Sequence, residues 1–369
     1  MASLQFHLYF LVLFLISNSI LVPTCCLGDT TCQLPRKHSA LFVFGDSLFD
    51  VGNNNYINST ADNQANYSPY GETFFKYPSG RFSDGRVLPD FIAEYAELPL
   101  IQPYLFPGYQ RYTNGVNFAS AGAGALVETN QGQVIDLKTQ LSYFKNVSNV
   151  LRQELGDAET KTLLAKAVYL INIGSNDYFV PLTENSSSTH EKYVDMVVGN
   201  LTNVIKGIHK IGGRKIGVLN QPPFGCIPAI KTLLNGTEGS CLEEASSLSK
   251  LHNSVLYEEL QKLEKQLKGF KYSYFDYFDS SFQVINYPSK YGFKVGDVAC
   301  CGSGPNRGYY SCGGKRAVKD YELCENISEH VFFDSVHPTE RAAHIISQLI
   351  WSGNQSIAGP YNLKTLFEE

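Results

Sequence analysis

The chain has 369 residues, of which 43% are apolar and 18% charged, so it can bury one large core and is not typical of a disordered protein. Its 30 Lys and Arg residues against 35 Asp and Glu residues give a net charge of −5 at pH 7, with no basic run. This composition excludes nucleic acid as an expected partner and predicts a single folded domain.

Residues 1–28 contain no Asp, Glu, Lys or Arg, and their apolar run at 8–16 ends at a polar Ser-Asn-Ser segment. A run this short is typical of a secretory signal peptide rather than a membrane span. The only positive groups before it are His7 and the amino terminus, which leaves an uncleaved signal anchor as the alternative. We expect residues 1–28 to be a signal peptide and 29–369 to be one secreted domain without stable membrane insertion.

Glycosylation sequons and cysteine spacing both agree with secretion. The eight Asn-x-Ser/Thr sequons that could accept glycans are at Asn58, Asn66, Asn146, Asn185, Asn200, Asn235, Asn326 and Asn354. The seven cysteines after residue 28 are Cys32, Cys226, Cys241, Cys300, Cys301, Cys312 and Cys324. None forms a Cys-x-x-Cys pair, so disulfides are favoured over zinc or dithiol redox chemistry. Cys226 and Cys241 could close a local loop, and the odd count leaves at least one thiol unpaired within the chain.

Short apolar runs alternate with longer amphipathic stretches, which indicates a parallel sheet with helices on its faces. The expected strands are residues 40–44, 115–118, 167–173, 215–219 and 271–276. The expected helices are residues 137–155, 190–211, 241–267 and 339–351, each with apolar residues at three- and four-residue spacing.

The segment 51–82 is rich in Asn, Tyr, Gly and Pro and predicts a long loop over the carboxyl edge of the sheet. A loop of this length in a compact domain is usually functional. Its aromatic residues suit contact with an apolar acyl or aryl group, or simple packing on the sheet: Tyr56, Tyr67, Tyr70, Phe74, Phe75 and Phe82.

Ser47 follows the first expected strand, in the segment Phe44-Gly45-Asp46-Ser47. A hydroxyl there lies at the carboxyl edge of the sheet, where open α/β folds build their sites, and a following helix would point N–H groups at a developing anion. Gly45 permits the backbone to turn sharply at the end of the strand. By itself this segment could be an ordinary turn, and the Gly-x-Ser-x-Gly elbow of α/β-hydrolases is absent.

Asp334 and His337 lie between an apolar segment and the last expected helix, and Pro338 keeps His337 out of helical backbone. A carboxylate three residues earlier can accept the Nδ1 proton of the imidazole, which leaves Nε2 free to take a proton from a serine. The alternative is that Asp334 only caps the turn and that His337 is a surface imidazole without a catalytic role.

Two segments at other strand ends offer hydrogen-bond donors. Gly122 lies in a turn of small residues, and Asn176 follows the third expected strand. The backbone N–H of Gly122 and the side-chain NH2 of Asn176 are donors of the type that an oxyanion hole requires. Each segment alone could be a loop turn, but four such segments at one sheet edge favour a single active site.

The sequence resembles the plant GDSL esterase/lipase family of the SGNH hydrolase superfamily from about residue 39 to about residue 351. The similar blocks are residues 45–54, 117–124, 174–177 and 334–339. The resemblance implies that Ser47 is the nucleophile, that Asp334 and His337 are the acid–base pair, and that the N–H of Ser47, the N–H of Gly122 and the Asn176 side chain form the oxyanion hole.

This sequence departs from the family pattern at Ala121 and Ser175, where relatives often have glycine; neither replaces a catalytic group. The turn Pro222-Pro223-Phe224-Gly225-Cys226 also resembles one in the family. We interpret it as structural, with a place in the acyl pocket as the alternative.

The resemblance implies a three-layer α/β/α, flavodoxin-like SGNH hydrolase fold with a five-stranded parallel sheet. It also implies a secreted serine esterase or lipase that acts on a small-molecule or lipid ester through an acyl-serine intermediate. The alternatives are an acyltransferase with the same triad and a secreted defence or binding glycoprotein. The remaining histidines show no ligand spacing and nucleotide motifs are missing, so we expect no metal or other cofactor.

Overall fold

The computed structural model describes residues 39–179, 182, 187–236 and 239–369, without the side chains of residues 187–189. These residues belong to one compact unit, His38–Glu369. The predicted signal peptide, Cys32 and the sequon at Asn185 lie outside the described residues. Among the described helices, none is long and apolar enough to cross a membrane.

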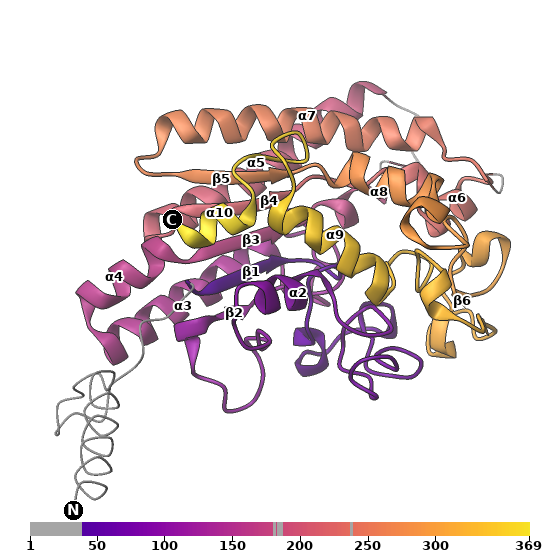
Figure 1. Ribbon diagram of the computed structural model, residues 1–369, viewed down its shortest axis with the longest axis horizontal. Helices are drawn as coiled ribbons and strands as arrows, with labels where there is room; N and C mark the ends of the chain where they lie inside the picture. The colour runs from indigo at the N-terminus through magenta and orange to yellow at the C-terminus, as the bar shows by residue number, and fades with distance from the viewer. Residues whose placement is uncertain (1–38, 180–181, 183–186, 237–238) are drawn as a thin grey trace, which may run out of the picture. The chain divides into compact units, whose positions relative to one another are not determined.

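A six-stranded sheet with strand order β2-β1-β3-β4-β5-β8 forms the centre of this unit (Figure 1). Its strands are β1 (Leu41–Gly45), β2 (Gly115–Asn117), β3 (Val168–Asn172), β4 (Lys215–Leu219), β5 (Lys271–Phe275) and β8 (Ala358–Pro360). The first five are parallel, which confirms the five predicted strands.

The prediction missed β8, which pairs antiparallel with β5 at the sheet edge. This strand has three residues, Ala-Gly-Pro, and a glycine and a proline give no strand signal in a sequence. A separate ladder of β6 (Cys301–Gly302) and β7 (Glu322–Leu323) also lies outside the predicted elements.

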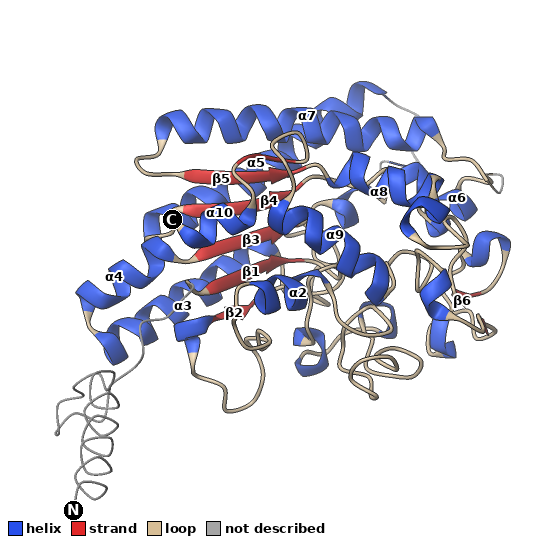
Figure 2. Cartoon of the chain, viewed as in Figure 1, coloured by secondary structure: helices blue, strands red, loops and turns tan. Residues whose placement is uncertain are grey.

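Successive side chains of a strand point to opposite faces of the sheet, so they pack into two separate hydrophobic cores, one on each face. On the first face, Phe42 and Phe44 join a cluster with α3 (Leu137–Leu155), α4 (Asp157–Lys166), α5 (Ser187–Ile211) and α7 (Glu243–Gln266). On the second face, Leu41 and Val43 join a cluster with α2 (Leu88–Tyr95), α8 (Tyr277–Asn286), α9 (Glu340–Ser352) and α10 (Leu363–Glu368). The three layers that result are visible in Figure 2.

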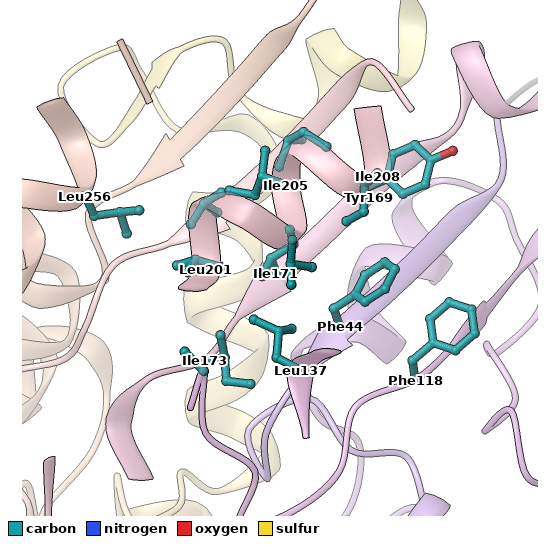
Figure 3. Close-up of a cluster of buried hydrophobic side chains, with 14 of the residues drawn as sticks. Phe44, Phe118, Leu137, Tyr169, Ile171, Ile173, Leu201, Ile205, Ile208 and Leu256 are labelled. Atoms are coloured by element: carbon teal, nitrogen blue, oxygen red, sulfur yellow. The ribbon is translucent and has the colours of Figure 1, made fainter. Parts of the chain in front are cut away.

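Figure 3 shows the core of the first face, where Phe44 and Ile171 from neighbouring strands lie beside Leu201 and Ile205 from α5. The four predicted helices correspond to α3, α5, α7 and α9. The helices that the prediction missed, α2, α4, α6 (Pro228–Leu233), α8 and α10, have ten residues or fewer, so their apolar periodicity is short.

The strand order 2-1-3-4-5 of the parallel part is that of flavodoxin-like folds. In this order the chain continues from β1 to β2 on one side of β1 and returns to β3 on the other, which opens a crevice at the carboxyl ends of β1 and β3. The predicted long loop at 51–82 leaves β1 at this edge and contains only two short 3₁₀ helices, η1 (Asn53–Tyr56) and η2 (Ala61–Asn63).

Candidate active site

Ser47 lies two residues past the end of β1, at the β1/β3 crevice. A side chain at Gly45 would place its Cβ 2.4 Å from the carbonyl oxygen of Asn172, so only glycine permits this exit from the strand. After Ser47 the chain makes one turn, closed by a 2.9 Å hydrogen bond from Asp50 N to Asp46 O. The expected helix after the serine is therefore reduced to this single turn.

Ser47, His337 and Asp334 form a continuous chain of hydrogen bonds. Ser47 Oγ lies 2.7 Å from His337 Nε2, although the two residues are 290 positions apart. His337 Nδ1 lies 2.8 Å and 3.0 Å from the two carboxylate oxygens of Asp334. An ionised carboxylate only accepts hydrogen bonds, so Nδ1 must hold the proton and Nε2 is free to accept one from the serine.

Asp334 is fully buried and receives hydrogen bonds from several sides. Its Oδ1 accepts from the backbone N–H groups of Val336 and His337, at 2.9 Å and 2.8 Å, and its Oδ2 accepts from the Tyr70 hydroxyl at 2.7 Å. Burial alone raises the pKa of Asp334, but His337, the positive charge of Arg316 and the Tyr70 hydroxyl outweigh burial and hold the pKa below its ordinary value. Asp334 is therefore a carboxylate at neutral pH.

Arg316 is a buried cation in an aromatic cage behind Asp334. Its guanidinium carbon lies 3.9 Å from the ring centroid of Tyr310 and 5.5 Å from that of Tyr70. The loop that contains Arg316 is closed by the disulfide Cys300–Cys324, and Cys301–Cys312 closes a smaller loop within it. The predicted disulfides are thus confirmed here, and they fasten the loop that brings this cation near the acid–base pair.

Two other buried aspartates near the nucleophile have raised pKa values, in contrast to Asp334. Burial raises the pKa of Asp46 to about 7, against a weaker opposing hydrogen bond from Leu48 N. Burial also raises the pKa of Asp50 to about 6, although backbone N–H groups oppose it. Of these three carboxyls, Asp334 is the one that stays ionised throughout the neutral range and faces the imidazole.

Gly122 and Asn176 line the same cavity as Ser47 and His337. Gly122 has φ +81°, and a Cβ there would lie 2.3 Å from Asn63 Oδ1, so the turn requires glycine. Asn176 lies in the 3₁₀ helix η4 (Ser175–Tyr178), and its Nδ2 donates to Ala123 O at 3.0 Å, which leaves its second N–H for a ligand. The four predicted catalytic segments therefore meet at one place.

Buried polar side chains join these segments to one another. Asp50, after β1, accepts a hydrogen bond from Ala121 N at 3.0 Å. Asp177, after β3, accepts from Ala125 N at 2.8 Å and from Leu126 N at 3.1 Å. These carboxylates tie the glycine turn to the strands on both sides, so both donor segments are held relative to Ser47.

The roles of Tyr70, Arg316, Asp50 and Asp177 were missed by sequence reasoning. Asp50 and Asp177 lie inside the motif blocks, and Tyr70 is one of the aromatic residues of the long loop, so a signal existed for these three. No sequence pattern pointed to Arg316.

The aromatic residues of the long loop mostly pack on the protein itself. Tyr70 contacts Phe333, with ring centroids 5.3 Å apart, and the exposed Tyr56 pairs with Phe106 at 6.1 Å. Of the six aromatic residues named above, Phe82 lines the cavity beside His337. Pro222 and Phe224 line a second cavity at Ser47, so the turn that we interpret as structural also forms part of the wall of the site.

Among the residues that the structure describes, no group of three or more His, Cys, Asp or Glu side chains could hold a metal ion.

Comparison with known proteins identifies close relatives along almost the entire chain. A family model described as GDSL-like lipase/acylhydrolase matches residues 41–350, which include Ser47, Asp334 and His337. The chain is 52% identical to GDSL esterase/lipase 1 of Arabidopsis thaliana over 353 residues, covering 93% of this chain and 94% of the relative. It is also 48% identical to a GDSL lipase of Tanacetum cinerariifolium over 350 residues, covering 95% and 93% of the two chains.

Proposed function

The chain belongs to the GDSL-like lipase/acylhydrolase family and is a carboxylic ester hydrolase, and on this premise we propose that Ser47, His337 and Asp334 are its catalytic residues. The observation that supports this proposal most is the hydrogen-bond chain from Ser47 Oγ through the imidazole to Asp334, with a first step of 2.7 Å. Its substrates are small-molecule or lipid esters.

In the first half of the reaction, Ser47 Oγ attacks the ester carbonyl while His337 Nε2 takes the hydroxyl proton. The oxyanion that forms receives hydrogen bonds from the N–H groups of Ser47 and Gly122 and from the Asn176 side chain. The carbon–oxygen bond to the alcohol then breaks, and His337 returns its proton to the departing alkoxide oxygen.

In the second half, a water molecule attacks the acyl-serine and His337 takes one of its protons. Collapse of the second tetrahedral intermediate releases the carboxylic acid and gives the proton back to Ser47 Oγ. Asp334 stays ionised throughout and stabilises the imidazolium that forms in each half.

Asn176→Ala is expected to lower kcat by about 10²–10³-fold, the usual effect of removing one oxyanion donor. Asn176→Asp has nearly the same size but lacks the N–H donor, so it should lose at least as much. Steady-state kinetics with a short p-nitrophenyl ester would measure both variants. A rise in KM at constant kcat would instead make Asn176 a substrate-binding residue.

The proposal includes secretion of the mature protein, with residues 1–28 as the signal peptide and 29–369 as the domain. Two features support it. The six described cysteines are all paired, as Cys226–Cys241, Cys300–Cys324 and Cys301–Cys312. The seven described sequon asparagines are all exposed, at Asn58, Asn66, Asn146, Asn200, Asn235, Asn326 and Asn354.

Peptide mapping of protein purified from a secreting plant host is expected to find these three disulfides without reductant and glycans on several of the sequons. The mature chain should begin near residue 29. Free thiols at all six positions together with unmodified sequons would contradict a secretory route.

A further inference from the structure

Two cavities of very different size meet at Ser47. The narrow one has a volume of about 60 Å³ and the wide one about 700 Å³. Both are lined by Ser47, Asn176 and His337, so they are two arms of the same site, which we name the narrow arm and the wide arm. An ester has two substituents on its reacting group, the acyl chain and the alcohol, and each arm can hold one of them.

The short helix α6 is the wall between the arms. Ile227 and Ile230 line the narrow arm, whereas Ala229, Thr232 and Leu233 line the wide arm. This division follows the helical repeat, because residues three and four apart share a face. Each arm therefore has wall residues of its own on one and the same helix.

Buried contacts fix the position of this wall. Lys231, on the remaining side of α6, is fully buried and its Nζ lies 2.9 Å from Asp297 Oδ2. Ala229 N donates to Ser335 O at 2.9 Å, which joins α6 directly to the loop of Asp334 and His337. The disulfide Cys226–Cys241 closes just before the helix begins. The wall is thus held relative to the catalytic imidazole.

The two linings are both predominantly apolar and differ mainly in size. Beyond the shared residues, the narrow arm has the apolar Leu48, Pro222, Phe224, Ile227 and Ile230 together with the polar Asp46, Asn172 and Ser175. The wide arm is over ten times larger, and its hydrogen-bonding side chains are Asp62, Asn63, Thr129, Asn130, Thr232 and Tyr310. A short alkyl chain fits the first space, and a large alcohol that bears further hydroxyl groups fits the second.

The order of the reaction assigns the arms. The alcohol leaves first, and water must then reach the acyl-serine beside His337 from the side that the alcohol has vacated. If the alcohol vacates the wide arm, water enters a large space with several hydrogen-bonding side chains. If it vacated the narrow arm, water would have to enter a space of about 60 Å³ while a bulky acyl chain filled the wide entrance, which leaves little room for an attacking water beside His337.

Building on the proposed function, we propose that the narrow arm holds a short acyl chain and the wide arm holds the alcohol. A volume of about 60 Å³ gives room on the order of five water molecules, which corresponds to an acyl chain of a few carbons. The preferred substrates are then esters of short-chain acids with large, hydroxylated alcohols, rather than esters of long-chain fatty acids.

The acyl side is tested with a series of methyl esters from acetate through butyrate and octanoate to laurate, with release of acid measured by titration. The kcat/KM of the unaltered protein should fall at least about tenfold from butyrate to octanoate. Ile230→Ala opens the narrow arm and should raise the octanoate-to-butyrate ratio about tenfold. Ile230→Val is a milder opening for the case in which Ile230→Ala does not fold, and it should shift the ratio in the same direction.

The alcohol side is tested at constant acyl group, with methyl butyrate against a butyryl ester of glucose. Ala229→Leu fills the wide arm from the neighbouring position of the same helix. It should lower the ratio of kcat/KM for the glucose ester to kcat/KM for the methyl ester about tenfold. The octanoate-to-butyrate ratio should change in the Ile230 variants and stay constant in Ala229→Leu. The two substitutions thus act as matched controls for each other.

A preference of the unaltered protein for octanoate or laurate, with the acyl-length ratio controlled by Ala229, would show that the acyl chain uses the wide arm and overturn the assignment. Equal responses of both ratios to both substitutions would also overturn it. Ester hydrolysis that survives Ser47→Ala would contradict the proposed catalytic residues themselves, so the two failures are distinguishable.

Discussion

Ser47→Ala is expected to lower kcat for short-chain esters by about 10⁵–10⁶-fold, because it deletes the atom that forms the acyl-enzyme. The residual rate would come from the oxyanion donors and from substrate binding alone. The substitution removes one hydroxyl whose hydrogen-bond partner is His337, on a half-buried side chain. The thermal unfolding temperature should therefore stay close to that of the unaltered protein.

Two measurements check this expectation. Steady-state hydrolysis of p-nitrophenyl butyrate gives the rate, and mass spectrometry after treatment with a fluorophosphonate locates the nucleophile. The reagent should add one phosphonyl group to the peptide that contains Ser47, and none to that peptide in the variant. Labelling of a different serine, with activity retained in Ser47→Ala, would refute the assignment.

Asp334→Asn is expected to lower kcat by about 10⁴-fold, the size of effect seen when the acid of a serine triad becomes an amide. The oxygen of the new amide can still accept from Val336 N and His337 N, so the loop should keep its shape. The amide NH2, however, would donate to His337 Nδ1. That leaves the imidazole proton on Nε2, where the ring cannot accept the proton of Ser47.

The pH dependence of stability provides a second readout for this variant. Because the native pKa of Asp334 is depressed, its charge stabilises the native state above the unfolded value of about 3.9, and this contribution is lost as the pH falls through the lower native pKa. Asp334→Asn should therefore be destabilised at pH 7 and much less so near pH 2. A deficit in the free energy of unfolding that does not depend on pH would contradict the charged role.

Asp46→Asn is the matched control, since it makes the same substitution at a buried aspartate next to the nucleophile. Its Oδ1 accepts from Leu48 N at 3.1 Å, which an amide oxygen can also do. Burial raises the pKa of Asp46 to about 7, so this carboxyl is only partly ionised at neutral pH, whereas Asp334 is ionised. We expect a loss of kcat within about tenfold. A loss as large as that of Asp334→Asn would mean that the effect is not specific to the imidazole partner.

Local patterns in the sequence determined much of the fold. The five parallel strands and the helices α3, α5, α7 and α9 follow from apolar runs and periodicity, which depend on neighbours within a few residues. The same holds for the placement of Ser47, Gly122 and Asn176 at one sheet edge, because the carboxyl ends of parallel strands must lie together. His337 follows none of these strands, and the tertiary structure brings it to this edge. Helices of ten residues or fewer, such as α6, and the Ala-Gly-Pro strand β8 gave too little pattern to be found.

Contacts between distant segments were decided by the tertiary structure alone. The hydrogen bond from Tyr70 to Asp334 spans 264 positions, and the Arg316 cage joins the long loop to a disulfide-closed one. The cysteines between 300 and 324 can pair in three ways, and only the packed loop selects Cys300–Cys324 with Cys301–Cys312. The two arms of the site likewise exist only once α6 has packed beside His337. In each case the interaction energy depends on proximity in space, and nothing in the local sequence records which distant side chain will be the neighbour.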